Sequence, residues 1–507
     1  MNVIKKTPAV IVIGAGIGGI ATAAHLAQQG LRVTVVEKNG RPGGRCDRFV
    51  RGGHHFDAGP TLFVMPLVYE AEFAALGVSM HDVLDLQRVD PTYHLVFDDN
   101  SRLTLTSDMK QMQEQLENIE PGSFQGLLRY LNEGCRHYRL ALEKLVNRDF
   151  RTATDFFSLG NIPLLFQLKP LAKHYDNMSH YFDHPRLKAA FTFQDVYMGL
   201  SPFEAPATFS MMPYTELAHG VWYPKGGMYR IVEALVEIAK ASGVEFEYDT
   251  AVTQIAMQGS TVKGVVLEDG RFLPADAVVA NADLPYVYQN LLPPNGTAQQ
   301  MKHKRYSCSV ISFFWGVDKP YPQLPPHTLF LADDYRGNYD SIINELALPQ
   351  TPSIYIHAPA RVDAAMAPSG EDTLIAIVPV GHLDETGEQD WPAIRAQARQ
   401  VVFERLAGLG MDDLEAHLKF EVNYTPLSWR KRYNLVKGAT HGLGHNLTQL
   451  GYMRPHNRDA HYHNLYFVGA STHPGTGVPT ALVSARLTAV RLLEEMGISS
   501  RMNNQRV

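Results

Sequence analysis

Residues 10–19, VIVIGAGIGG, decide the fold of this chain. The apolar residues 10–13 predict a short buried strand, and the glycines of a G-x-G-x-x-G turn follow it directly. Residues 18–29 are rich in alanine and predict the helix that this turn opens. Because glycines at these positions let a backbone turn sharply and approach a pyrophosphate, the stretch predicts a βαβ unit with a phosphate group at its helix N-terminus.

A second predicted strand, residues 31–36, ends at Glu37. At this spacing a carboxylate can accept hydrogen bonds from both hydroxyls of an adenosine ribose. The complete motif therefore predicts that the chain binds a dinucleotide through the glycine turn and Glu37. The alternative is a glycine-rich turn in an apolar βαβ unit that binds nothing.

The composition of the 507 residues is that of a globular protein of two or three domains. Hydrophobic residues make up 45% and charged residues 19%, and the net charge of −6 provides no polybasic field, so we expect no nucleic acid partner. The three cysteines, Cys46, Cys135 and Cys308, lie far apart in the sequence. They predict no disulfide framework, which fits a reducing cytoplasm.

Lys5 and Lys6 precede an uncharged run, residues 7–31, that superficially resembles a signal peptide or a membrane span. Five glycines interrupt this run. Each glycine would cost a spanning helix about 1 kcal/mol relative to alanine, whereas a strand, a tight turn and a packed helix would use them. We therefore favour the dinucleotide-binding interpretation over a targeting segment.

The sequence after Glu37 favours FAD over NAD as the dinucleotide. Residues 38–49, KNGRPGGRCDRF, contain a second glycine turn followed by a cation, Arg45, which would suit a pyrophosphate held along its whole length. A nicotinamide-binding domain would normally continue into a helix here. The arrangement resembles the flavoprotein superfamily of amine oxidases and carotenoid desaturases, in which R-x-G-G-R follows the ribose acid, and this resemblance implies FAD.

The predicted FAD domain is assembled from separated segments. Residues 244–280 alternate with the period of strands and predict a β-meander. Residues 464–470, NLYFVGA, predict another parallel strand, and a glycine-rich turn leads from it into a predicted helix, residues 481–496. We expect an α/β fold made of a Rossmann-like FAD domain with two dinucleotide-binding folds (residues 1–90, 221–291 and 431–507) and a mixed α+β cap or substrate domain (residues 91–220 and 292–430).

The block GVWYPKGGM, residues 220–228, resembles a signature of the bacterial-type carotenoid desaturases, the family of phytoene desaturase and dehydrosqualene desaturase. The ending YMRPHNRD…NLYFVGASTHPGTGVP and further phrases over essentially the whole chain resemble the same family. The resemblance implies an FAD-dependent enzyme that inserts conjugated double bonds into a hydrophobic acyclic carotenoid precursor. It does not separate the C40 substrate phytoene from the C30 substrate dehydrosqualene.

The motifs and the resemblance together assign the cofactor site. The turn that contains Gly477 is expected to face the isoalloxazine and ribityl end of FAD, and the resemblance implies that Val252 lies near the adenine. The full set of expected FAD-binding residues is Gly14, Ala15, Gly16, Gly18, Gly19, Glu37, Lys38, Gly43, Gly44, Arg45, Gly59, Pro60, Thr61, Val252, Gly469, Ala470, Gly477, Val478 and Pro479.

Desaturation removes a hydride equivalent, which a flavin can take, and a proton, which needs an acceptor. Glu216, His219 and Lys225 flank or lie in the family block, and His473 lies in the C-terminal turn. We expect His473 and Glu216 to be the catalytic polar groups near the flavin, and the alternative is that they are structural or surface residues. The pairs His54-His55 and His461-x-His463 have no companions at ligand spacing, so we predict no metal site.

Residues 156–168, FFSLGNIPLLFQL, carry no charge. They predict either a segment that docks into the headgroup region of a membrane or a core helix of the cap. A second apolar set is expected either to line a tunnel for a polyene or to pack as core, and it consists of Tyr197, Met198, Phe203, Phe209, Met211, Met212 and Trp222.

The sequence has no second G-x-G-x-x-G in a separate βαβ unit that could hold NAD(P)H. We therefore expect dioxygen or a membrane quinone as electron acceptor, and a cytoplasmic enzyme peripherally associated with the inner membrane. The alternatives are a late-pathway carotenoid oxidoreductase (a hydroxycarotenoid desaturase, a terminal methyl oxidase or a carotene isomerase), a flavin-binding protein without activity, and an amine oxidase. The apolar composition of the predicted cap argues against the amine oxidase.

Overall fold

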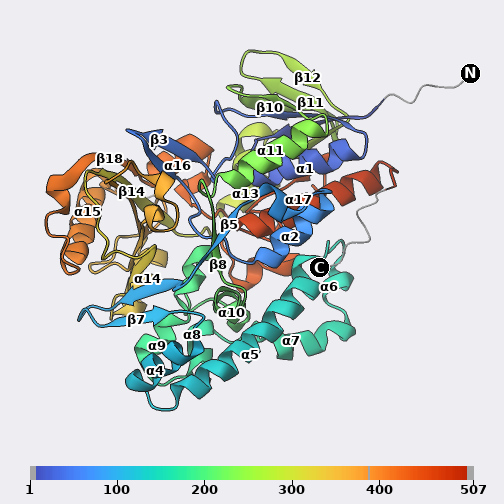
Figure 1. The fold of residues 1–507 in the computed structure, drawn as a ribbon. Helices are drawn as coiled ribbons and strands as arrows, with labels where there is room; N and C mark the ends of the chain where they lie inside the picture. The colour runs from blue at the N-terminus through green and yellow to red at the C-terminus, as the bar shows by residue number, and fades with distance from the viewer. Residues whose placement is uncertain (1–6, 386, 388, 500–507) are drawn as a thin grey trace, which may run out of the picture.

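A computed structural model describes residues 7–385, 387 and 389–499 of the chain (Figure 1). Its first unit is a five-stranded parallel sheet with the strand order β19-β13-β1-β2-β9. These strands come from three distant parts of the sequence, namely β1 (Ala9–Ile13), β2 (Arg32–Val36), β9 (Glu245–Glu247), β13 (Ala277–Ala280) and β19 (Leu465–Phe467).

Strand β1 is buried on both faces, which explains why its sequence is continuously apolar. Val10 and Val12 belong to the core that packs against the helices, whereas Ile11 and Ile13 belong to the core on the opposite side. The helices are α1 (Ile17–Gln28), α11 (Arg230–Ala241) and α17 (Val478–Glu495), which lie together in Figure 1. The opposite side is covered by the three-stranded antiparallel meander β10 (Val252–Gln258), β11 (Thr261–Leu267) and β12 (Phe272–Pro274).

The second unit is a seven-stranded sheet that combines strands from two separate parts of the chain. Its order is β18-β14-β17-β16-β15-β6-β7, and all neighbours are antiparallel except β15 and β6. The strands are β6 (Tyr93–Val96), β7 (Arg102–Leu105), β14 (Ser309–Val317), β15 (His327–Phe330), β16 (Ile354–His357), β17 (Asp372–Val380) and β18 (Leu418–Tyr424). Helix α15 (Trp391–Ala407) packs on one face of this sheet through Trp391, Ala398 and Val402.

A helical region completes the molecule and lies at the bottom of Figure 1. Its longest member is α5 (Ser123–Ala141), which runs into a π-helical turn, Leu142–Val146. The other α-helices of the molecule, inside and outside this region, are α2 (Pro66–Ala75), α3 (Met80–Val83), α4 (Met109–Ile119), α6 (Ala153–Phe156), α7 (Ile162–Leu168), α8 (His174–Asn177), α9 (Pro185–Ala190), α10 (Met211–Ala218), α12 (Leu284–Tyr286), α13 (Gly296–Lys302), α14 (Tyr335–Ile343) and α16 (Pro426–Tyr433). Two strand pairs lie outside the large sheets, β3 (Arg48–Arg51) with β4 (His54–Asp57) and β5 (Leu86–Val89) with β8 (Val221–Pro224).

The expected α/β architecture is present, with differences at the edges of its elements. The C-terminal helix begins at Val478 rather than at residue 481, because Pro479 fits the first turn of a helix, where no backbone donor is needed. The expectation that residues 244–280 form one meander is wrong in part. The two ends of that stretch, β9 and β13, join the parallel sheet instead, since the sequence pattern of a short strand does not indicate which sheet it joins.

The domain boundaries at residues 90, 220, 291 and 430 remain a prediction. Both stretches assigned to the cap contribute strands to the seven-stranded sheet. Within the described part of the chain, helices that combine the length and the apolar character needed to cross a bilayer are absent.

Candidate functional site

One cavity of about 490 Å³ connects the parallel sheet with the seven-stranded sheet. At one end it is lined by residues that follow the carboxyl ends of the parallel strands, including Gly14 after β1, Glu37 after β2 and Gly469 after β19. Open α/β sheets bind their ligands at this edge. On the side of the seven-stranded sheet, the lining includes Phe314 of β14 and Ile375 of β17, and most of the lining residues from this sheet are apolar.

The glycine turns form a cradle with no room for side chains. A Cβ at position 19 would lie 2.2 Å from the carbonyl oxygen of Gly14, and a Cβ at position 59 would lie 1.8 Å from that of Arg45. The two glycine turns also touch, because the backbone N–H of Gly43 donates to the carbonyl of Ala15 over 2.8 Å. The result is a surface of bare backbone at the start of α1, which is suited to a pyrophosphate.

The Glu37 carboxylate is held in place by neighbouring donors. Its Oε2 accepts from the backbone N–H of Ala15 over 2.8 Å, and its Oε1 accepts from the backbone N–H and the side chain of Asn39 over 2.9 and 2.8 Å. An ionised carboxylate has about four acceptor positions, so three such bonds leave capacity for a further donor. Glu37 lines the cavity, and this geometry fits a ribose hydroxyl.

Arg45 places a cation beside the glycine turns. Its guanidinium donates to the carbonyl of Thr440 over 2.8 Å and lines the cavity. Burial lowers the pKa of Arg45, and the nearby carboxylate of Asp283 opposes this effect. Asp283 itself accepts from the Ser471 hydroxyl over 2.7 Å. A half-buried cation at the edge of a phosphate cradle is suited to a pyrophosphate, so these residues fit FAD.

The family block supports this cradle from behind. The Asp57 carboxylate accepts from the Tyr223 hydroxyl over 2.8 Å and from the backbone N–H of Met228 over 3.0 Å, while burial raises the pKa of Asp57 to about 6. A Cβ at Gly227 would lie 2.9 Å from the same carboxylate. Asp57 lines the cavity, whereas residues 220–228 do not appear in its wall. The block therefore supports the cavity wall at Asp57 and does not line the cavity itself.

Arg454 is a structural residue whose role the sequence did not reveal. Its side chain is fully buried and donates to the backbone carbonyls of Thr472 and Gly444 over 2.9 and 3.1 Å. It also donates to the carbonyls of Leu443, Gln449 and Ala470. Burial lowers the pKa of Arg454 to about 9. One guanidinium thus ties the C-terminal turn to a loop about 25 residues earlier in the chain, and this bond pattern was not visible in the sequence.

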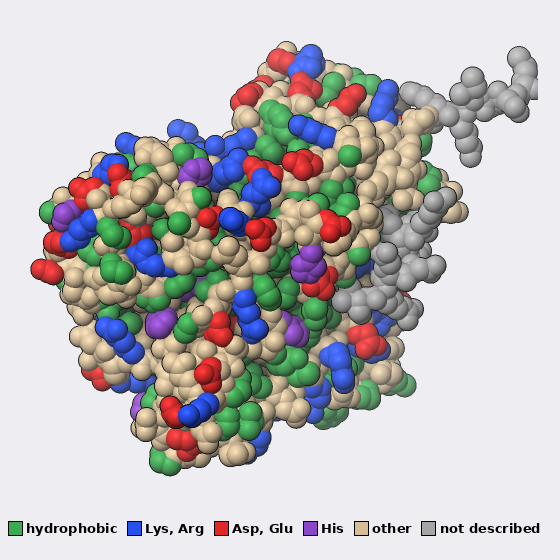
Figure 2. Space-filling view, in the orientation of Figure 1, with side chains coloured by type: hydrophobic (Ala, Val, Ile, Leu, Met, Phe, Trp, Pro, Cys, Tyr) green, Lys and Arg blue, Asp and Glu red, His purple; other side chains and the backbone are tan. Residues whose placement is uncertain are grey.

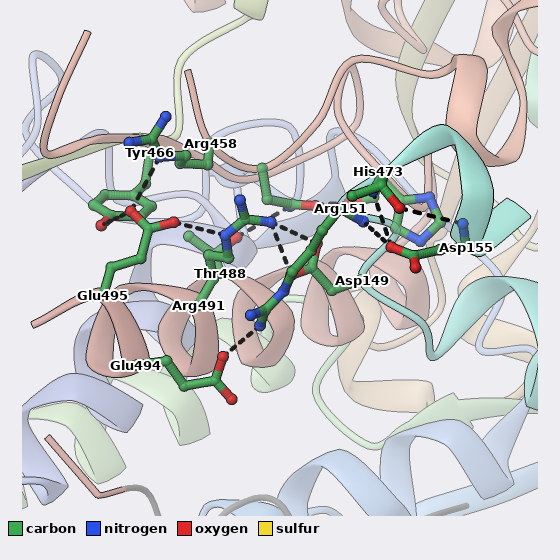
Figure 3. A network of polar contacts seen from close by, with 12 residues as sticks. Asp149, Arg151, Asp155, Arg458, Tyr466, His473, Thr488, Arg491, Glu494 and Glu495 are labelled. Carbon is green, nitrogen blue, oxygen red and sulfur yellow. Dashed lines mark hydrogen bonds and ion pairs between the residues drawn. The ribbon is translucent and has the colours of Figure 1, made fainter. Parts of the chain in front are cut away.

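The structure separates the two expected catalytic residues. His473 is buried outside the cavity wall, and its ring packs edge-on against Phe150 at a centroid distance of 5.7 Å. Figure 3 shows it beside the ion pairs that join Asp149 to α17. Burial lowers the pKa of His473 to about 4. Packing against Phe150 directs the ring toward the segment around that residue, and the expected catalytic role of His473 near the flavin stays a prediction.

Glu216 is 2% exposed and likewise does not line the cavity. Its Oε1 accepts from the Tyr93 hydroxyl over 3.0 Å, and its Oε2 accepts from the Gln194 amide over 3.0 Å. The Tyr197 hydroxyl donates to that of Tyr93 over 2.7 Å, and Tyr197 lines the cavity. Burial raises the pKa of Glu216 to about 7. Glu216 is therefore connected to the cavity through two phenol groups.

The remaining sequence expectations divide as follows. Of the expected FAD-binding residues, all except Ala15 and Gly19 line the cavity, and those two support the turn through their backbone. Of the expected tunnel set, Tyr197, Met198, Met211 and Met212 line the cavity, whereas Phe203, Phe209 and Trp222 pack in cores. The sequence did not indicate the contributions of the seven-stranded sheet to the wall, which are Val310, Ser312, Phe314, Tyr355, Ile375, Ile377 and Pro379.

The flanking polar residues His219 and Lys225 do not line the cavity, and the His219 ring contacts Tyr138 and Tyr214. Among the residues that the structure describes, no group of three or more His, Cys, Asp or Glu side chains is arranged to hold a metal ion.

Comparison with known proteins connects this geometry to a family. Residues 17–493 match a family described as "Flavin containing amine oxidoreductase". The chain is 43% identical to a zeta-carotene-forming phytoene desaturase of Myxococcus xanthus, over 96% of this chain and 93% of that protein. It is 34% identical to a 4,4'-diapophytoene desaturase of Staphylococcus haemolyticus, over 96% of this chain and 99% of that protein. A putrescine oxidase structure shares the fold at 15% identity, with a TM-score of 0.63 over 96% of this chain and 99% of that one.

Proposed function

Since this chain belongs to the flavin containing amine oxidoreductase family and resembles carotenoid desaturases over nearly its whole length, we propose that it is an FAD-dependent carotenoid desaturase. It introduces conjugated double bonds into a hydrophobic acyclic precursor. The observation that carries this proposal is one cavity whose lining combines the glycine turns and Glu37 with apolar side chains of the seven-stranded sheet.

The two ends of the cavity have different tasks. Gly14, Glu37 and Arg45 hold and orient the dinucleotide, and bound FAD supplies the acceptor for the hydride equivalent. Met211 and Phe314 are among the apolar residues that line the cavity, and such a lining excludes water and would hold a hydrocarbon beside the flavin. A methionine side chain is flexible and adapts to the irregular outline of a branched polyene better than a β-branched aliphatic side chain does.

We propose phytoene, the C40 precursor, as the preferred substrate. The chain is more similar to the phytoene desaturase of Myxococcus xanthus than to the diapophytoene desaturase of Staphylococcus haemolyticus, at 43% against 34% identity. Purified enzyme should bleach its flavin under anaerobic conditions when phytoene is added in lipid vesicles. Faster bleaching by the C30 precursor would reverse the substrate preference, and an unchanged flavin with both precursors would refute the desaturase proposal.

A membrane surface is proposed as the source of this insoluble substrate. Leu159 and Phe166 are 85% and 79% exposed, and Phe157, Ile162 and Leu165 beside them are exposed too. Figure 2 shows hydrophobic side chains next to Lys and Arg side chains at the lower right of this face, where Figure 1 places α6 and α7. Exposed apolar side chains on a short helix can insert into the headgroup region, where they lose contact with water.

The exposed segment is close in the sequence to a residue of the cavity wall. Val146, at the end of the π-helical turn, lines the cavity, and the exposed segment begins about ten residues later. We further propose that reduced enzyme passes its electrons to a membrane quinone or to dioxygen, and that the protein is cytoplasmic and peripherally bound to the inner membrane. Efficient reoxidation of the reduced enzyme by NAD(P), instead of by quinone or oxygen, would contradict the proposed electron acceptor.

A further inference from the structure

A chain of three hydrogen-bonded side chains leads from the cavity wall into the protein interior. Tyr197 lies in a 3-10 turn (Phe193–Met198), Tyr93 begins β6, and Glu216 lies on α10. The Tyr197 hydroxyl donates to the Tyr93 oxygen over 2.7 Å, and the Tyr93 hydroxyl donates to Glu216 Oε1 over 3.0 Å. Tyr197 lines the cavity, whereas Tyr93 and Glu216 are buried behind it.

Glu216 differs in its partners from two other buried glutamates, Glu72 and Glu133. Glu72 pairs with Arg486 over 2.9 Å, and Glu133 pairs with Lys169. None of the described lysine, arginine or histidine side chains forms an ion pair with Glu216, and its donors are neutral phenol and amide groups. A buried carboxylate without a cation favours the protonated form, so this group is suited to accept a proton near neutral pH.

Among the groups described around these three side chains, the Glu216 carboxylate is the best proton acceptor. The Gln194 amide donates to Glu216, and the neighbouring Asp195 carboxylate is hydrogen-bonded to the His174 ring over 2.9 Å. On the β15–β16 side, the His327 ring lies 5.9 Å from that of Tyr93, and burial lowers the pKa of His327 well below its usual value. Burial also lowers the pKa of the cavity-lining His441 to about 4, so both imidazoles are weaker proton acceptors than the Glu216 carboxylate.

We infer that Tyr197, Tyr93 and Glu216 form the path by which the proton of each desaturation step leaves the substrate, an inference that rests on the proposed function. Once the hydride equivalent has left one carbon, the C–H bond of its neighbour breaks and that electron pair becomes the new π bond. The proton moves to the Tyr197 oxygen, the Tyr197 proton moves to Tyr93, and the Tyr93 proton moves to the Glu216 carboxylate. Reduction of the quinone or dioxygen acceptor takes up two hydrogens, so the stored proton returns along the same path.

The test compares three variants with the wild type in anaerobic stopped-flow measurements of flavin bleaching by phytoene vesicles across the pH range around neutrality. Glu216→Gln removes the acceptor, Tyr197→Phe interrupts the path at the cavity, and Tyr335→Phe removes a buried hydroxyl that does not line the cavity. Loss of a proton acceptor typically costs about 10²- to 10⁴-fold in rate. We expect this loss in the first two variants, unchanged FAD content in all three, and wild-type rates for Tyr335→Phe.

Two readouts distinguish a proton path from structural damage. The wild-type bleaching rate should rise with pH as Glu216 loses its proton, and this dependence should disappear in Glu216→Gln. Infrared difference spectra should contain a protonated carboxyl band that grows as the pH falls through about 7 in the wild type and is absent from Glu216→Gln. If the wild type bleaches but Glu216→Gln keeps its rate and pH profile, the path is refuted while the desaturase proposal stands. If the wild type does not bleach with any carotenoid precursor, both fail.

Discussion

The carboxyl group of Glu216 is expected to control how the stability of the fold depends on pH, and Glu216→Gln tests this without disturbing the packing. The amide has nearly the same volume, and Tyr93 can still donate to its oxygen. Gln194 Oε1 has no hydrogen-bond partner among the described residues, so the Gln194 side chain can rotate and accept from the new NH₂ group. The variant should therefore keep its hydrogen bonds and lose only the titrating group.

The size and sign of the effect follow from the pKa shift. Burial raises the pKa of Glu216 from 4.5 to about 7, and one pKa unit corresponds to about 1.36 kcal/mol, so the expected effect is about 3 kcal/mol. Between these two pH values the folded protein holds a proton that the unfolded chain has lost. The free energy of unfolding therefore falls as the pH rises from about 4.5 to about 7, and this contribution is constant above that window.

The assay is urea unfolding of the FAD-loaded wild type and Glu216→Gln at a series of pH values. The wild type should lose up to about 3 kcal/mol relative to the variant between the low and the high end of the window. Glu114→Gln changes a surface carboxylate on α4 and serves as the control, for which we expect no such pH-dependent difference. Parallel stability curves for the wild type and Glu216→Gln would refute the reasoning, because the buried carboxyl would then titrate as it does in the unfolded chain.

Two further predictions concern the cofactor cradle and the membrane surface. Gly19→Ala should weaken FAD binding by about tenfold or more, because overpacking costs about 1–3 kcal/mol, whereas Gly296→Ala, where a Cβ meets no atom within 4 Å, should bind FAD normally in a fluorescence titration. Tight FAD binding by Gly19→Ala would contradict the cradle. The double variant Leu159→Ser with Phe166→Ser should lose most vesicle cosedimentation, whereas Phe272→Ser, an exposed residue on the meander, should retain it. Equal cosedimentation of both would argue against the proposed docking surface.

The cofactor cradle could be predicted because its information is local in the sequence. The turn from Gly14 to Gly19 and the acid at Glu37 lie within one βαβ unit, so spacing alone places them together. The C-terminal turn at Gly477 was predicted in the same way, from a strand, a glycine turn and a helix. Where strand, turn and helix are contiguous in the sequence, the motif alone predicts that the backbone of the turn faces the ligand.

The roles of single side chains outside such motifs could not be predicted. Glu216 depends on Tyr93, which is 123 residues away and is brought close only when β6 joins the seven-stranded sheet. The family block was found in the sequence, but its function as a brace depends on Asp57, about 170 residues earlier. His473 was placed correctly in its turn, yet the direction of its ring is set by Phe150. These contacts are tertiary, and the sequence pattern around each residue contains no sign of them.

The central claim is that the cavity holds FAD and an acyclic carotenoid precursor and converts the latter into a conjugated polyene. The most direct test is to express the chain in cells that make either phytoene or dehydrosqualene. The extracted pigments are then separated by chromatography and their absorption spectra are recorded. The account predicts new yellow or red polyenes from phytoene, and little or none from dehydrosqualene. Unchanged precursors in both hosts, from protein that has bound FAD, would contradict it.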